Sequence, residues 1–163
     1  MKKLKVGVVG LGFMGKMHFD VYSKNPLSEV TYICDTDKKK LAGDWSAIGG
    51  NIKGACSEKL DLSKIQMTSD FTDLLKSDLD IIDVCLPTHL HSKFAVAALN
   101  AGKNCFCEKP VGIDLADAKK IAKAADATSH ILQVGQCIRF WPEYAALKDL
   151  VAKKIYGRVK AAT

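Results

Sequence analysis

Three glycines near the amino terminus have the spacing of a phosphate-binding loop. Gly10, Gly12 and Gly15 form a G-x-G-x-x-G motif directly after an apolar stretch and directly before a segment with helical spacing. In such a loop the first glycine permits a tight turn, the second lets backbone approach a pyrophosphate, and the third lets the next helix pack closely. The start of that helix offers N–H groups and a positive dipole end. The motif therefore predicts a dinucleotide site, with Phe13 and Met14 inside it.

An acidic residue stands where the adenosine ribose of a bound dinucleotide would need one. Asp35 lies 20 residues after Gly15, at the end of the second predicted strand. Its carboxylate can accept hydrogen bonds from both ribose hydroxyls and would repel a 2′-phosphate, which favours NAD over NADP. The lysines at 38–40 follow closely and either offset this repulsion or lie on a solvated helix face. We expect NAD as the cofactor, with NADP as the alternative.

Cysteine and histidine spacings do not predict a metal site. No C-x-x-C motif occurs, and most of the cysteines lie in apolar stretches, where a cysteine is a small buried residue. The six are Cys34, Cys56, Cys85, Cys105, Cys107 and Cys137. Cys105 and Cys107 alternate along one predicted strand and should share a face. His89 and His91 lack a third ligand, and His18 is expected to pack near the phosphate loop rather than to act in catalysis.

The elements that must position these residues alternate between strand and helix. Apolar, β-branched runs predict strands over 4–9, 30–34, 65–67, 81–86, 104–107 and 131–134. Helical spacing predicts helices over 13–24, 38–48, 70–75, 92–100, 114–128 and 142–154. The glycine-rich stretch 49–64 interrupts the pattern as a looped excursion. The alternation predicts an α/β fold, a doubly wound, mostly parallel sheet with helices on both faces.

Three of these segments carry more specific expectations. The first helix is expected to carry Met14, Met17 and Val21 on one side. The strand at 81–86 is almost wholly apolar, as expected of a central strand buried on both faces. Segment 157–159 looks like the entry to a further strand.

Several short motifs, in a fixed order, extend this interpretation over essentially the whole chain. They are Gly10 to Gly15 continuing to His18, Asp35-Thr36-Asp37, Leu86-Pro87-Thr88-His89-Leu90-His91, Ala101-Gly102-Lys103, Glu108-Lys109-Pro110 and Arg139-Phe140-Trp141-Pro142. In this combination the sequence resembles the Gfo/Idh/MocA oxidoreductases, which include glucose–fructose oxidoreductase and inositol dehydrogenase. The resemblance implies an NAD(P)-dependent dehydrogenase that acts on CH–OH groups of sugars or polyols.

The resemblance also implies roles for individual residues. Lys109 is similar to the catalytic lysine, and a cation beside a carbinol oxygen would stabilise a developing alkoxide. Glu108 is similar to the residue that helps to hold the nicotinamide ribose, which the loop with Pro87, Thr88 and His91 borders. An ordinary exposed Glu-Lys pair is the alternative. The expected cofactor-binding residues are Gly10, Gly12, Phe13, Met14, Gly15, Asp35, Leu86, Pro87, Thr88, His91, Glu108, Lys109 and Arg139.

Composition limits the classes of partner. Apolar residues make up 48% of the 163 residues and charged residues 26%, as in an ordinary globular domain. The formal charge of +6 comes from scattered lysines, which favours a solvated surface over nucleic-acid binding. No apolar run is long enough to span a bilayer and no secretion signal is evident, so we expect a cytoplasmic protein with reduced cysteines and no membrane partner.

The chain stops in mid-element, and its resemblance to enzymes about twice as long predicts a missing part. We expect a dinucleotide-binding domain over 1–155 and the start of a substrate and oligomerisation domain over 156–163. The chain alone would then be inactive, and the full enzyme a homo-oligomer through the missing domain. The alternative is a stand-alone dinucleotide-binding or sensing module without catalysis.

Overall fold

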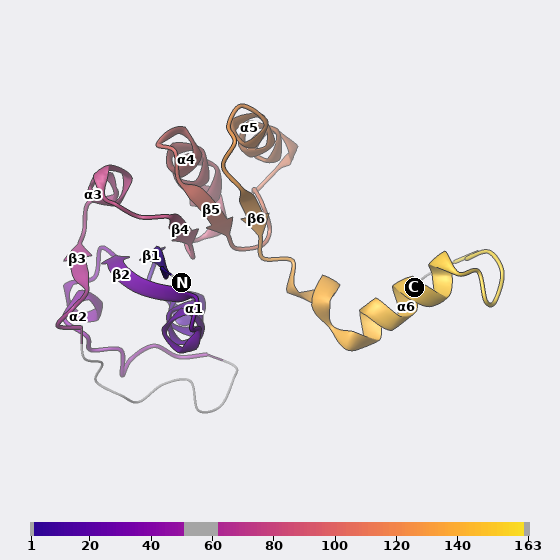
Figure 1. The fold of residues 1–163 in the computed structure, drawn as a ribbon, viewed down its shortest axis with the longest axis horizontal. Helices are drawn as coiled ribbons and strands as arrows, with labels where there is room; N and C mark the ends of the chain where they lie inside the picture. The colour runs from indigo at the N-terminus through magenta and orange to yellow at the C-terminus, as the bar shows by residue number, and fades with distance from the viewer. Residues whose placement is uncertain (1, 51–61, 162–163) are drawn as a thin grey trace.

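Six parallel strands form one sheet in the part of the chain that the computed structural model describes, residues 2–50 and 62–161. The strand order is β3-β2-β1-β4-β5-β6 (Figure 1). The strands are β1 (Leu4–Val9), β2 (Ser28–Cys34), β3 (Gln66–Thr68), β4 (Ile81–Val84), β5 (Asn104–Cys107) and β6 (Leu132–Val134). The order runs outward in both directions from β1 and β4, so the predicted doubly wound fold is confirmed.

Helices cover both faces of this sheet. They are α1 (Phe13–Lys24), α2 (Lys38–Leu41), α3 (Phe71–Lys76), α4 (Thr88–Asn100) and α5 (Leu115–Asp126). A 3₁₀ turn, η1 (Cys137–Phe140), and a last helix, α6 (Pro142–Ala152), follow β6. One core packs Phe19 of α1 and Trp45 against Val8. The other packs α3, α4 and α5 against the opposite face, with Leu99 and Ile121 among its buried residues.

The strands end at one level, and this alignment builds an edge for a ligand. Val9 of β1 pairs with Cys34 of β2 and with Val84 of β4. Val84 in turn pairs with Cys107, which pairs with Val134. The residues that follow the strands therefore meet at one carboxyl edge, where open α/β sheets bind ligands.

The buried side of α1 and the end of α2 are set by close contacts. The buried residues of α1 are Gly15, Lys16 and Phe19 rather than those on the side with Met14, Met17 and Val21, because the close approach at Gly15 sets which side faces β1. The predicted end of α2 is wrong. Helix α2 ends at Leu41 instead of continuing to 48. Gly43 adopts φ +82°, which breaks the helix, and Trp45 then folds back to donate its indole N–H to the Lys40 carbonyl at 2.7 Å.

Helix α4 begins four residues before its predicted start at 92. Pro87 is its N-cap, with φ −56°, and the polar segment Thr88–His91 forms the first turn. His91 is therefore a buried helical residue rather than part of an open loop. Asp70 and Asp114 cap α3 and α5, since each accepts a hydrogen bond from a backbone N–H of its helix.

Beyond β6 the chain leaves the sheet. Figure 1 shows η1 and α6 projecting away from the body that carries the strands. Every residue from Gln136 to Ala161 is exposed. No strand forms at 157–159, because no described strand lies beside this segment to pair with it. The predicted excursion at 49–64 lies mostly outside the described residues, as does Cys56.

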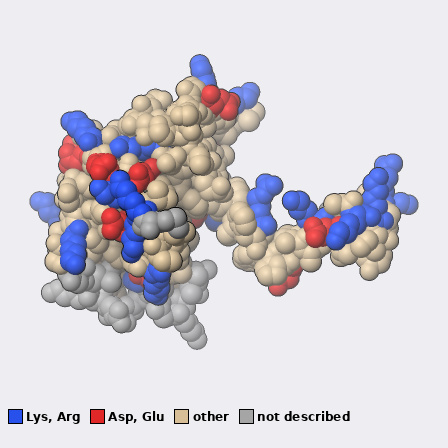
Figure 2. Space-filling view, in the orientation of Figure 1, with Lys and Arg blue, Asp and Glu red and all other residues tan. Residues whose placement is uncertain are grey.

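Charges of both signs are mixed on the surface of the sheet-bearing body. On the face shown in Figure 2, Lys and Arg of the sheet-bearing body are interspersed with Asp and Glu. Lys5 pairs with Asp78, and Lys16 with Asp20. No described helix combines the length and the apolar character needed to cross a membrane.

Candidate functional site

The glycine loop leaves an open approach at its centre. A side chain at Gly10, whose φ is +89°, would lie 2.6 Å from the Cys85 carbonyl oxygen, and one at Gly15 would collide with the Gly10 carbonyl. A Cβ at Gly12, by contrast, would meet nothing within 4 Å among the described residues. The outer two glycines thus let β1, β4 and α1 pack closely, and the middle one leaves backbone accessible to a ligand.

The amino end of α1 forms one wall of this opening. Gly12 is its N-cap, no described side chain caps it, and its first turn carries no acidic residue. Its first N–H groups therefore remain available to an anionic ligand, with the positive end of the helix dipole behind them. Together with the space at Gly12, this arrangement fits a pyrophosphate.

Asp35 links the end of β2 to the glycine loop. Its Oδ2 accepts a hydrogen bond from the Leu11 N–H at 2.6 Å, and its Oδ1 accepts one from the Asp37 N–H at 2.8 Å. The ammonium of Lys40 lies 3.7 Å from Oδ2. The carboxylate is held in one orientation at the edge, and each oxygen keeps a second lone pair for a hydroxyl donor.

A hollow of about 600 Å³ adjoins the loop on the Asp35 side. Its lining residues come from the glycine loop and the segment that follows β2: Gly12, Phe13, Asp37, Lys39, Lys40, Asp44, Ser46, Ala47, Ile48 and Gly49. The volume lies in the range of small-molecule sites, and its position suits the adenosine end of a dinucleotide.

On the other side of β1, His91 joins the two loops that would border the nicotinamide end. Its Nδ1 lies 2.7 Å from the Pro110 carbonyl oxygen and its Nε2 lies 2.7 Å from the Leu86 carbonyl oxygen. His91 is 1% exposed. His91 thus ties the loop after β4, with Pro87 and Thr88, to the loop after β5, and both its ring nitrogens already have protein partners.

Glu108 and Lys109 follow β5 at the same edge. Glu108 is buried, and its Oε2 accepts a hydrogen bond from the Lys109 N–H at 3.0 Å. Lys109 is exposed, and its peptide bond to Pro110 is cis. The carboxylate is fixed beneath the edge while the ammonium is accessible above it, which suits contact with a ligand oxygen.

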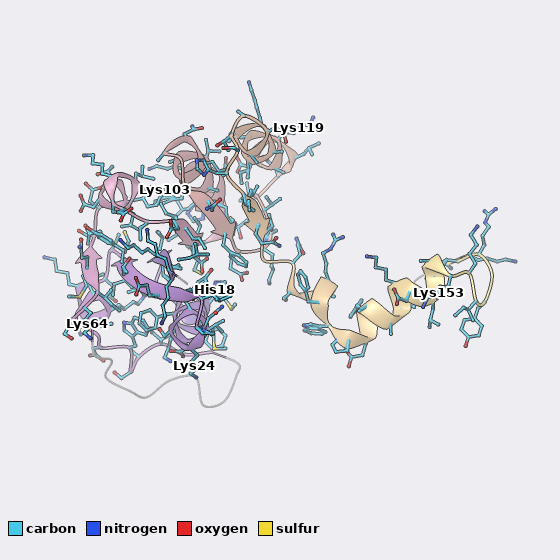
Figure 3. All side chains as sticks on the ribbon, viewed as in Figure 1. His18, Lys24, Lys64, Lys103, Lys119 and Lys153 are labelled. Atoms are coloured by element: carbon cyan, nitrogen blue, oxygen red, sulfur yellow. The ribbon has the colours of Figure 1, made fainter. Side chains whose placement is uncertain are left out.

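Beneath Glu108, a buried cluster centres on His18, which Figure 3 labels on α1. Its Nδ1 lies 2.8 Å from Asp83 Oδ2 and its Nε2 lies 3.2 Å from Glu108 Oε1. Burial opposes charge on the ring, but the hydrogen bond and charge of Asp83, followed by those of Glu108, outweigh it and raise the pKa of His18. The two carboxylates thus favour the imidazolium over the neutral ring.

Cys85 completes this cluster. Its Sγ lies 3.4 Å from Asp83 Oδ1 and 3.2 Å from His18 Nδ1. Burial, together with the charge of Asp83, raises the pKa of the Cys85 thiol, so the thiol stays protonated and donates to the carboxylate. His18, Asp83 and Cys85 are the one described group with the donor atoms and spacing of a metal site.

The structure brings most of the predicted residues together and leaves one apart. The glycine loop, Asp35, Leu86 to Thr88, Glu108 and Lys109 all lie at the carboxyl edge. Arg139 lies on η1, in the exposed segment that projects from the sheet. Its expected contact with the cofactor stays a prediction.

Asp83 is the residue of this site that the sequence pattern alone did not single out. It is fully buried, at 0% exposed, on the same sheet face as α1. The signal was present in the sequence, since Asp83 is the one acidic residue in the apolar run 81–86. A buried acid in such a strand requires a partner, and the partner, His18, lies 65 residues away in sequence.

Residues 4–136 match the Gfo/Idh/MocA family, described as an oxidoreductase family with an NAD-binding Rossmann fold. The chain belongs to the Gfo/Idh/MocA oxidoreductases. Two curated relatives show how much of such a protein it spans. YrbE, an uncharacterized oxidoreductase of Bacillus subtilis (strain 168), is 31% identical over 151 residues, which cover 92% of this chain and 40% of YrbE. Inositol 2-dehydrogenase/D-chiro-inositol 3-dehydrogenase of Lactiplantibacillus plantarum is 30% identical over 162 residues, covering 94% and 41%.

A solved structure agrees with these relatives in the share of its chain that this Gfo/Idh/MocA domain covers. The scyllo-inositol dehydrogenase of Lactobacillus casei, with bound NAD(H) and scyllo-inositol, matches it with a TM-score of 0.79 and 28% identity. The match covers 96% of this chain and 43% of that one. The chain thus spans about two fifths of the length of these relatives and contains their NAD-binding domain.

Proposed function

We propose that this Gfo/Idh/MocA domain binds NAD(H) for an oxidoreductase that acts on a CH–OH group of a sugar or polyol. The observation that carries the proposal is the shared carboxyl edge, which places the open Gly12 backbone, Asp35 and the Glu108-Lys109 pair along one line. The relative that was solved with NAD(H) and scyllo-inositol supports both the cofactor and the class of substrate.

Each part of the edge then has a distinct task. The amino end of α1 and the glycine loop bind the pyrophosphate, and Asp35 accepts the adenosine ribose hydroxyls. Glu108 accepts a hydroxyl of the ribose at the reactive end, bordered by Leu86, Pro87 and Thr88. Phe13 and Met14 contribute the first turn of α1.

Lys109 acts on the substrate in this proposal. The nicotinamide ring of the bound cofactor supplies the acceptor for a hydride. The exposed Lys109 ammonium lies where it can contact the carbinol oxygen and stabilise the negative charge that develops there. Removal of the hydroxyl proton needs a base as well, and we expect that base and most substrate contacts to come from the part of the enzyme that this chain does not span. We therefore expect no turnover of polyols by the chain alone.

The preference for NAD over NADP follows from Asp35. Its carboxylate would repel a 2′-phosphate, and Lys40 at 3.7 Å reduces that repulsion without reversing it. We expect the chain to bind NADH more tightly than NADPH, with Asp35→Ser bringing the two affinities within a few-fold of each other.

Calorimetric titration of the purified chain with NADH and NADPH tests the proposal. Asp78→Ser is the matched control, because it removes an exposed carboxylate that pairs with Lys5 at the opposite edge of the sheet. It should leave both affinities unchanged. No binding of NADH at millimolar concentration would refute the proposed function, and an unchanged NADH to NADPH ratio in Asp35→Ser would remove Asp35 from the ribose role.

A further inference from the structure

Three ionisable side chains from separate elements form a chain of two contacts beneath the proposed cofactor edge. Asp83 on β4 contacts His18 on α1 at 2.8 Å, and His18 contacts Glu108, after β5, at 3.2 Å. The Asp83 side chain is 0% exposed, and those of His18 and Glu108 are 16% and 11% exposed. Strand order places β4 between β1 and β5, which is why a helix that follows β1 reaches both carboxylates.

The contacts require both nitrogens of His18 to donate. Each nitrogen faces a carboxylate oxygen, and a carboxylate accepts hydrogen bonds, so the imidazolium satisfies both partners whereas a neutral ring satisfies one. Two further groups that face this cluster are neutral: the thiol of Cys85 and the hydroxyl of Tyr22. Burial and the charge of Asp83 both raise the pKa of Tyr22. Phe106 contacts the ring edge to face, with centroids 5.3 Å apart.

Glu108 is held from a second side as well. Its other oxygen accepts the Lys109 N–H, so the orientation of the carboxylate is set relative to the backbone of the proposed catalytic lysine. Gly135, after β6, leaves room for the Glu108 carboxylate, since a Cβ at position 135 would lie 3.0 Å from Glu108 Oε1. Each carboxylate oxygen has one protein donor and retains a lone pair.

We propose that His18, anchored by Asp83, is a positioning residue that fixes the Glu108 carboxylate to accept a hydroxyl of the ribose at the reactive end of the cofactor. The proposal rests on the proposed function, because Glu108 meets that ribose only if the domain binds NAD(H). Charged hydrogen bonds that are already formed before binding reduce the ordering that binding requires, so they strengthen the ribose contact.

A metal ion held by His18, Asp83 and Cys85 is the competing interpretation of the cluster. The donors contact one another directly at 2.8 to 3.4 Å, and the buried thiol keeps its proton by hydrogen bonding to Asp83. Glu108 on the remaining nitrogen of His18 supplies a complete set of partners without an ion. The hydrogen-bonded network therefore accounts for every polar contact of His18.

The two halves of the cofactor allow a sharp test on the chain itself. ADP-ribose carries the second ribose and ADP lacks it, so the ratio of their affinities measures the contact with that ribose. Asparagine at position 18 can replace Nδ1 toward Asp83 but is too short to reach Glu108, whereas glutamine can replace Nε2 toward Glu108. We expect His18→Asn and Glu108→Gln each to reduce the ratio about tenfold, and His18→Gln to retain most of it.

The affinity for ADP should stay unchanged in all three variants, since the glycine loop and Asp35 are intact. The double variant of His18→Asn and Glu108→Gln should show no further loss, because both changes remove the same contact. His130→Asn, before β6 at the opposite edge, is the matched control and should leave the ratio unchanged. Circular dichroism and thermal melting confirm that each variant is folded before it is titrated.

The outcomes separate this proposal from the proposed function. A wild-type chain that binds neither ADP nor ADP-ribose refutes both. Binding of both ligands with an unchanged ratio in His18→Asn and Glu108→Gln refutes the positioning role alone, as does an equal loss of ADP affinity, which would indicate a purely structural role.

Imidazole ¹⁵N spectra give a readout without ligand. At pH 7 both nitrogens of His18 should carry protons, and a single-proton tautomer, or stoichiometric Zn²⁺ binding that His18→Asn abolishes, would overturn the proposal.

Discussion

Asp35, Glu108 and Lys109 are the side chains that would contact the cofactor or substrate, whereas His18, Asp83 and His91 set the position of the groups around them. Asp35 and Glu108 each accept backbone N–H donors and are directed to the edge before any ligand arrives. His91 contacts two loop carbonyls. At the scale of the residue, the site consists of few ligand contacts and a larger set of supporting ones.

Lys109→Ala should lower kcat strongly in an enzyme that contains this domain. Loss of one charged contact made mainly in the transition state costs on the order of 3 kcal/mol, or about a hundredfold in rate. NADH affinity should change by no more than a few-fold, because the lysine lies at the opposite end of the edge from Asp35. Steady-state kinetics with a polyol and direct NADH titration measure the two effects. Lys119→Ala, on α5 and exposed, is the control, and near-normal turnover in Lys109→Ala would remove the lysine from catalysis.

The pH dependence of stability should show the charge of His18. Its pKa is raised in the folded chain above the ordinary value of 6.5, mainly by Asp83 and Glu108 against the opposing effect of burial. The stabilisation is therefore fully present below about 6.5 and is lost as the pH rises through the folded pKa. Urea unfolding at a series of pH values should show wild type losing stability relative to His18→Asn on the alkaline side. A difference that does not vary with pH would contradict a charged His18.

Among the helices, α1 contributes to the phosphate site, to the His18 cluster and to the core. Its amino end faces the proposed phosphates, its second turn supplies His18, and its buried side packs Phe19 against Trp45 with ring centroids 5.0 Å apart. These demands coincide because Gly15 lets the helix approach the Gly10 backbone. The spacing of the glycines thus sets the position of His18 as well as that of the loop.

Two alanine substitutions should separate packing from binding in this element. Gly15→Ala places a methyl group against the Gly10 carbonyl and should lower the free energy of unfolding by about 3 kcal/mol, although alanine favours a helix. Gly12→Ala meets open space and should cost about 1 kcal/mol or less. It should nevertheless weaken NADH binding, because the methyl group projects where the phosphates would approach. Chemical denaturation and NADH titration of both variants measure this, and a stable, tightly binding Gly15→Ala would contradict the packing argument.

At the scale of the whole molecule, the sheet with its two cores differs from the segment that follows β6. The family match ends at residue 136, where the exposed segment begins. Large apolar side chains on that segment are exposed, among them Phe140 at 75% and Tyr156 at 87%. The boundary predicted at 155 stays a prediction, since residues 142–152 lie away from the sheet (Figure 1).

Amide hydrogen exchange should follow this division. Helix α6 has 11 residues, none of them buried, and helices of this length are marginal in water without packing. Its amides should exchange at least about a hundredfold faster than those of α5, a 12-residue helix that buries Ile121 and Ala124. Exchange measured by mass spectrometry on the purified chain gives the comparison. Equal protection of both helices would show that α6 packs against something in solution.

Local sequence patterns are sufficient to predict the fold class, the ends of most strands and the residues along the carboxyl edge. Strand alternation, glycine spacing and helix caps depend on neighbours within a few residues, so β1, α1 and β5 have the predicted bounds. The edge then follows, because parallel strands that are wound the same way end at one level.

The residues that support that edge are set by contacts between segments far apart in the sequence. The contact between His18 and Asp83 spans 65 residues, and it exists because strand order places β4 beside β1. The buried side of α1 depends on its contact with the Gly10 backbone, and the early end of α2 depends on the hydrogen bond from Trp45. Local periodicity predicts neither contact. Local patterns report hydrogen bonding and burial near in sequence, whereas long-range packing depends on the topology that those patterns build.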